Sequence, residues 1–166
     1  MIIDFEFGFL KASTALADEH LDRLDKEAKV SEDPDSFGLF DQIEYITGFG
    51  FVACQTYLTA TIGSTQYEKQ QALRLGPMHR TGQPIVRLVN ECANHWKHSG
   101  EWQDDEDNPR AARTLQIIST LGVETDQSYP IAQALHALLM PHPARFKHLL
   151  PFLAQWRDLL SAEQAV

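Results

Sequence analysis

The chain has 166 residues, of which 43% are hydrophobic and 22% are charged, a composition that suits one globular domain with a real core. The formal net charge of −9 argues against non-specific nucleic-acid binding, and we expect no DNA partner. No apolar run reaches the ~18 residues that span a membrane, and the N-terminus lacks the features of a secretory signal, so we expect a cytoplasmic protein without a membrane partner.

The first half of the chain predicts two long helices, over residues 5–30 and 39–62, joined by a polar loop. The second helix is apolar almost all round, as expected in the middle of a bundle. Gly48 and Gly50 within it indicate a close approach by another helix. Cys54 lies in the same apolar pattern and Cys92 in a later one, so we expect two buried thiols and no disulfide.

The second half predicts shorter helices separated by proline, glycine and polar residues. Ser64 is a candidate cap for the first of them, and Pro151 should kink or split the last. An acidic loop is expected near residues 103–108. The predicted helices cover residues 64–75, 84–98, 109–121, 130 to the break at 141, and 144–162. Residues 1–166 therefore predict a single domain with an all-α fold, a bundle of five to seven helices around one core.

The charge is distributed unevenly along the chain. Residues 1–45 contain 12 acidic and 4 basic side chains, whereas residues 69–98 contain 5 basic side chains and one acidic side chain, Glu91. The central region can therefore attract an anion locally, or it can dock against the acidic part of its own chain.

The predicted helix over residues 84–98 has two contrasting faces, and Ser99-Gly100 is expected to end it. Its apolar stripe consists of Ile85, Leu88, Val89, Cys92 and Trp96. The opposite line holds Arg87, Glu91, Asn94 and His98, with Asn90, Lys97 and His95 beside it.

Four interpretations of this polar face are open. The simplest is a solvated helix surface, which an amphipathic helix presents without any further function. The second is a site for a phosphodiester, because imidazoles move protons near neutral pH while Arg and Lys stabilise anions. The third is a metal site formed by Glu91, His95 and His98, which offer a carboxylate and two imidazoles. The fourth is a protein–protein surface centred on Trp96 or Trp102.

Several common catalytic signatures are absent from the sequence. It contains no P-loop, no GxGxxG motif, no CxxC pair, no HExxH motif and no GxSxG motif. The sequence therefore gives no support to the usual nucleotide-binding, zinc-protease or hydrolase functions, and it predicts no cofactor.

The two long helices followed by the segment from Asn90 to His98, NECANHWKH, resemble the HEPN group of bacterial helical domains over residues 39–100. Active members of that group carry an Arg, four to six further residues and then a His on a helix near a dimer interface. Four residues separate Arg74 from His79, although Gly76 and Pro77 interrupt a helix there. Seven residues separate Arg87 from His95.

The resemblance implies a homodimer or another protein partner, and it implies metal-independent cleavage or binding of RNA. In that hypothesis His95 or His98 is the general acid or base, Arg87 and Lys97 stabilise the anion, and Asn94 positions the substrate through a hydrogen bond. The alternatives are a non-catalytic interaction module, which would cover this face with a partner and leave no concave pocket, and the metal site described above.

Overall fold

The computed structural model describes residues 4–102 and 108–163, and within these ranges it contains seven α-helices, one 3₁₀ helix and no β-strand. The predicted all-α bundle is confirmed. Residues 103–107 of the acidic loop expected near residues 103–108 lie outside the described residues. The helices are α1 (Phe5–Val30), α2 (Leu39–Gly63), α3 (Lys69–Ala72), α4 (Ile85–Trp102), α5 (Pro109–Ser119), α6 (Pro130–Leu139), η1 (Phe146–His148) and α7 (Leu150–Glu163).

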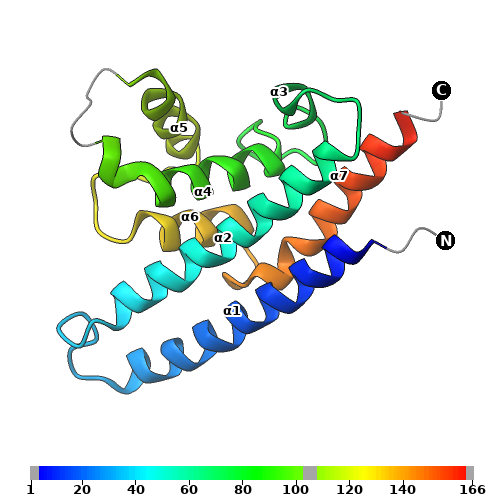
Figure 1. Ribbon diagram of the computed structural model, residues 1–166. Coiled ribbons are helices and arrows are strands. Elements are labelled where there is room, and N and C mark those ends of the chain that lie inside the picture. Colours follow the sequence, from blue (N-terminus) through cyan, green and yellow to red (C-terminus); the bar gives the residue numbers. More distant parts are fainter. Residues whose placement is uncertain (1–3, 103–107, 164–166) are drawn as a thin grey trace.

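Helices α1 and α2 form a long antiparallel hairpin along one side of the molecule (Figure 1). Asp4 starts α1 by accepting a hydrogen bond of 2.9 Å from the backbone N–H of Phe7. One stripe of α1 then faces the core and includes Leu10, Leu21 and Leu24. The predicted bounds of α1 are confirmed, and α2 extends one residue beyond its prediction.

Two glycines of α2 are contact points for bulky aromatic side chains. A Cβ atom at Gly48 would overlap the indole of Trp96, and a Cβ atom at Gly50 would overlap the ring of Phe146. The expectation that these glycines mark a close approach is confirmed, because their missing side chains let α4 and η1 pack against the α2 backbone.

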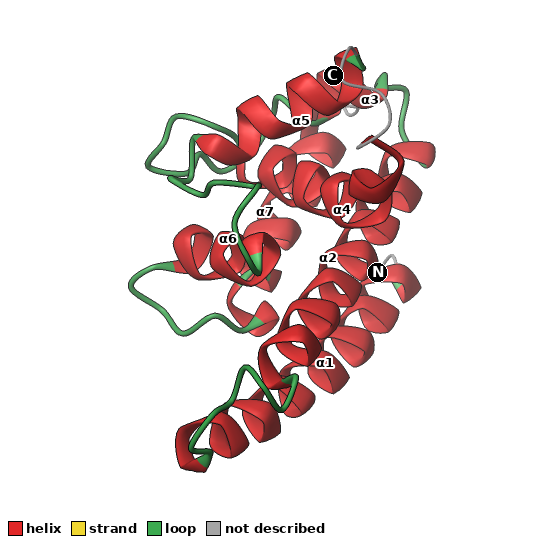
Figure 2. Ribbon diagram, turned by 90° about the vertical axis from the view of Figure 1, so that its left-hand side faces the viewer, coloured by secondary structure: helices red, strands yellow, loops and turns green. Residues whose placement is uncertain are grey.

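Helix α4 lies in the middle of the fold, between α5 and the α1–α2 hairpin (Figures 1 and 2). It contacts α2, α5, α6 and α7. The predicted apolar stripe is buried, apart from Trp96, which is partly buried against the core. However, Asn90, Glu91 and His95 of the expected polar region are also buried, because α2 and α5 cover that side. The solvated-face interpretation is therefore wrong for these three residues.

Two of the predicted helices have wrong bounds. Only residues 69–72 of the expected helix over residues 64–75 are helical, and Ser64 instead ends α2, with its hydroxyl donating to the carbonyl of Thr61. The start of α3 is capped by Glu68, paired with Gln71. Helix α4 continues through Gly100 to Trp102, whose ring lies 6.0 Å from that of His98 between centroids. Gly100 does not adopt the left-handed conformation that ends a helix.

Two helices in the last third of the chain begin on carboxylates from the first hairpin. The carboxylate of Glu44 on α2 accepts from the backbone N–H groups of Ile131 and Ala132 at 2.9 and 2.7 Å. In the same way, Asp18 of α1 accepts from Phe146 N–H and Lys147 N–H at 2.7 and 2.9 Å. These contacts satisfy N–H groups that a helix start leaves without a partner.

In the described part of the chain, no helix combines the length and apolar character needed to cross a membrane.

Candidate functional site

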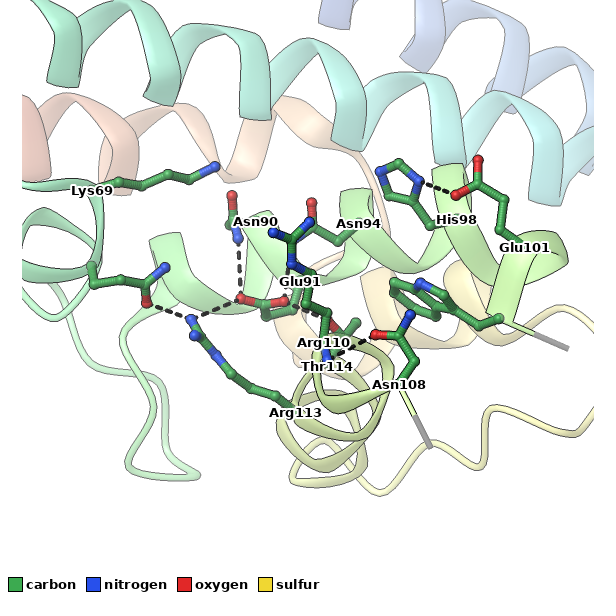
Figure 3. A pocket seen from close by; sticks show the side chains of 12 residues that line it. Lys69, Asn90, Glu91, Asn94, His98, Glu101, Asn108, Arg110, Arg113 and Thr114 are labelled. Atoms are coloured by element: carbon green, nitrogen blue, oxygen red, sulfur yellow. Dashed lines mark hydrogen bonds and ion pairs between the residues drawn. The ribbon is translucent and has the colours of Figure 1, made fainter. Parts of the chain in front are cut away.

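A polar cleft of about 490 Å³ opens between α4 and α5, with α3 at one end (Figure 3). Its walls carry amides, carboxylates, cations and one indole, and few aliphatic side chains. The lining residues are Lys69, Gln70, Asn90, Glu91, Asn94, His98, Glu101, Trp102, Asn108, Arg110, Arg113 and Thr114. A cleft of this size and polarity suits a small hydrogen-bonding ligand.

The carboxylate of Glu91 forms the floor of the cleft and is only 2% exposed. It accepts hydrogen bonds from Asn90 Nδ2 at 3.1 Å, from Asn94 Nδ2 at 3.2 Å and from Thr114 Oγ1 at 2.7 Å. Arg113 Nη2 lies 3.8 Å from Glu91 Oε1 and offsets its charge. A buried charge needs this kind of hydrogen-bonded surrounding, because desolvation otherwise makes it costly.

The orientation of these amides is fixed from α2. Gln55 Nε2 lies 3.0 Å from Asn90 Oδ1 and 2.8 Å from Asn94 Oδ1, while Gln55 Oε1 accepts from Lys97 Nζ at 2.6 Å. An ammonium group only donates and a carboxylate only accepts. Lys97 at one end and Glu91 at the other therefore determine which way each amide between them points.

Three cations line the cleft above this floor. Arg113 is 43% exposed and donates to the side-chain oxygen of Gln70, so its guanidinium is held between α3 and Glu91. Lys69 lies with Arg113 at one end of the cleft, and Arg110 projects from α5 near its middle (Figure 3). Partial burial, and secondly the positive charge of Lys69, lowers the pKa of Lys97. The Lys69 end of the cleft is therefore electropositive.

Two histidines of α4 occupy different environments. His98 lines the cleft, is 41% exposed and pairs with Glu101, its Nδ1 lying 3.1 Å from Glu101 Oε2 (Figure 3). His95 is 7% exposed and packs near Trp102, with ring centroids 6.3 Å apart. Burial lowers the pKa of His95, and among the described residues its Nδ1 has no hydrogen-bond partner.

The cleft brings together only part of the predicted catalytic set. Asn94 and His98 line it, whereas Lys97 acts behind its wall by binding Gln55. His95 and Arg87 are not among the lining residues. The predicted group of five is therefore divided along and around its helix. His95 and Lys97 point away from the line of Asn94 and His98, whereas Arg87 lies on that line but about two turns earlier, beyond the cleft.

Two further sequence interpretations are corrected by the geometry. Glu91, His95 and His98 do not converge, and across residues 4–102 and 108–163 no three His, Cys, Asp or Glu side chains form a group that can hold a metal ion. The interaction-module hypothesis expected no concave pocket on this face, yet the face contains the cleft.

Several residues of the site were missed by the sequence analysis. Gln55 carried a signal, because it is the only carboxamide side chain between Tyr45 and Gly63, a stretch of α2 without any charged residue. Arg110 and Arg113 lie one turn apart after the helix start at Asn108, but the approach of Arg113 to Glu91 depends on helix packing. No protein-family model, curated protein or solved structure matches this chain.

Proposed function

We propose that this protein binds a small anionic ligand, one that carries a phosphate or carboxylate group, in the cleft between α4 and α5. The observation that carries this proposal is the placement of Lys69, Arg110 and Arg113 around one concave, polar space of about 490 Å³. Guanidinium groups bind phosphate and carboxylate oxygens through paired, charge-assisted hydrogen bonds. The hydrogen-bonded floor gives these cations a rigid base.

The contacts indicate which residues bind the ligand and which residues support the site. Glu91 and the amides already bind one another, so they support the site and leave ligand binding to the cations above them. The guanidinium of Arg113 has five N–H donors and uses part of them to bind Gln70. The Arg113 side chain remains partly exposed to a ligand. A ligand bound there would also approach the indole of Trp102, which favours an anion that carries a flat or apolar portion.

Titration calorimetry with inorganic phosphate and with a nucleoside monophosphate tests the proposal. We expect saturable binding at one site per chain, weakened roughly tenfold or more by the double variant Arg110→Gln/Arg113→Gln. The matched control is Arg23→Gln on α1, an exposed arginine that pairs with Glu27. An absence of saturable binding, or an equal loss in the control, would refute the proposal.

Metal-independent RNA cleavage is a second candidate, favoured by the position of His98 in the same cleft as the three cations. His98 would exchange a proton with the ribose hydroxyl or the leaving oxygen, and Arg110, Arg113 and Lys69 would stabilise the phosphoryl anion. His95 contributes little to catalysis in this mechanism, because it is buried and does not line the cleft.

Incubation of purified protein with single-stranded RNA in EDTA tests this second candidate. We expect cleavage by the wild type and by His136→Ala, which changes an exposed histidine of α6, and a loss in His98→Ala. Equal cleavage by all three would indicate a contaminating nuclease and exclude His98.

The cytoplasmic location that we propose is supported by the free thiols of Cys54 and Cys92, which persist in a reducing compartment.

A further inference from the structure

Helix α1 carries two apolar stripes, and the fold uses only one of them. Leu10, Leu21 and Leu24 face the core. A second stripe on the outside is formed by Phe5, Phe9 and Leu16, which are 67%, 65% and 66% exposed. Their spacing of four and seven residues places them on one side of the helix. A helix with two apolar stripes has a surface for a second partner.

The neighbouring surface of α2 extends this apolar stripe. Tyr45 and Phe49, one helical turn apart, are 64% and 47% exposed, and the helix has no charged residue from Tyr45 to Gly63. We call the surface made by Phe5, Phe9, Leu16, Tyr45 and Phe49 the hairpin face. A contiguous apolar surface over two helices is unusual for a monomer, because exposed apolar patches of this kind mark interaction sites.

The hairpin face is grooved between its two helices. A depression of about 260 Å³ lies where Phe9 and Ser13 of α1 meet Val52, Ala53 and Thr56 of α2. Its lining is mostly apolar and contains one acidic residue, Glu6. Large side chains beside small ones form the knobs and holes with which helices interdigitate. Further along α1 the outward residues become polar, with Arg23 paired to Glu27, so the apolar centre has a charged rim.

The dimensions of the α1–α2 hairpin, which carries the hairpin face and its charged rim, suit a stable dimer. At 1.5 Å per residue, the 26 residues of α1 extend over ~39 Å, and two helices side by side are ~20 Å wide. The outer surface of the whole hairpin, apolar centre and charged rim together, therefore has a projected area of ~780 Å², close to the ~800 Å² per partner that standard protein interfaces bury.

We propose that a second copy of this chain docks on the hairpin face, so that two α1–α2 hairpins pack around a twofold axis as a four-helix bundle. A twofold axis brings the same surface of both chains together, which demands a face that does not repel itself. A chain with a net charge of −9 repels its own copy over most orientations. The nearly uncharged centre of the hairpin face removes that repulsion at the contact.

A membrane surface fits this face less well. Helices that lie on membranes carry Lys and Arg beside their apolar stripe, where they meet anionic lipids. The region from residue 1 to residue 45, which contains α1, has 12 acidic and 4 basic residues. The proposed contact is also separate from the ligand cleft, because α5 lies on the opposite side of α4 from α1 (Figures 1 and 2).

Analytical ultracentrifugation of the full chain at micromolar concentrations tests the proposal. We expect the wild type to sediment with twice the 18.8 kDa mass of one chain. The double variant Phe9→Asp/Phe49→Asp should sediment as a monomer with an unchanged far-ultraviolet circular dichroism spectrum, since both side chains are exposed in the single chain. The control Met140→Asp, which changes a side chain that is 47% exposed outside the hairpin face, should remain dimeric.

Two outcomes would overturn the proposal: a double variant that remains dimeric, or a monomeric wild type, whether it stays free or floats with vesicles of anionic phospholipid. Flotation with the vesicles would assign the hairpin face to membranes. If the double variant proves unfolded, the single variant Ala12→Asp decides the matter instead. It adds a charge at an exposed helix position of the same stripe, and it should also give a monomer.

Discussion

Lys97 Nζ donates a hydrogen bond of 2.6 Å to the side-chain oxygen of Gln55, 42 residues earlier in the chain. This contact orients the Gln55 amide, whose nitrogen then faces the oxygens of Asn90 and Asn94. The amide nitrogens of both asparagines consequently face Glu91. An exposed lysine thus helps to set the hydrogen-bonding pattern of a buried floor.

Replacement of Gln55 by leucine should therefore destabilise the protein by about 1–3 kcal/mol, because the oxygens of Asn90 and Asn94 would lose their shared donor inside the fold. Lys97→Met should cost less, since Lys97 itself is exposed. Urea denaturation measures both changes. Gln42→Leu, on the exposed side of the same helix, serves as the control and should change stability by no more than about 0.5 kcal/mol.

Replacement of Glu91 by glutamine keeps the shape of the side chain but turns one acceptor into a donor. That amide nitrogen must face either Asn90 or the Asn94–Thr114 pair, all of which donate to the native carboxylate. We expect a loss of about 1–3 kcal/mol in unfolding free energy. Glu101→Gln, at an exposed carboxylate, should leave stability nearly unchanged; equal effects of the two variants would show that the buried hydrogen bonds do not matter.

Gly50→Ala should destabilise the fold by about 1–3 kcal/mol, because the added methyl group overlaps the ring of Phe146. Gly8→Ala provides the matched control in another helix, since no atom lies within 4 Å of the added carbon. There the intrinsic helix preference of alanine should add about 0.5–1 kcal/mol. Thermal unfolding of the two variants should therefore shift in opposite directions.

The burial of His95 predicts a loss of stability in mild acid. Burial lowers the pKa of His95 below its ordinary value of 6.5, so the unfolded chain takes up a proton there before the folded chain does. This contribution to stability is present above about pH 6.5 and is lost as the pH falls below it.

Chemical denaturation at neutral pH and in mild acid checks whether stability falls with pH in this way. The free energy of unfolding should fall less between the two conditions in His95→Leu than in the wild type. His136→Leu should behave like the wild type, because His136 is exposed. An identical pH dependence in His95→Leu and the wild type would contradict the prediction.

The helices were largely predictable because their signals are local. The bounds of α1 follow from its spacing and cap, and Pro151 divides the last helical segment as expected, into η1 and α7. Gly100 misled the prediction for α4, because Trp102, which lies beyond it, packs its ring near those of His95 and His98. A glycine signal is weak where side-chain contacts extend the helix.

The candidate site was only partly predictable, because its geometry depends on contacts between distant residues. Asn94 and His98 were predicted from the sequence as site residues, and both line the cleft. Glu91 was expected on an open helix face, whereas α5 brings Thr114 and Arg113 over that carboxylate. No local pattern within α4 indicates which helix will cover it.

The carboxylates of Asp18 and Glu44 hold the starts of η1 and α6 from more than 80 residues away. Neither start has a side-chain cap within its own segment. The C-terminal third of the chain therefore depends on side chains of the N-terminal hairpin to start two of its helices. A fragment beginning at residue 108 should be poorly helical when expressed alone, and should gain helix when a separate peptide containing residues 1–102 is added.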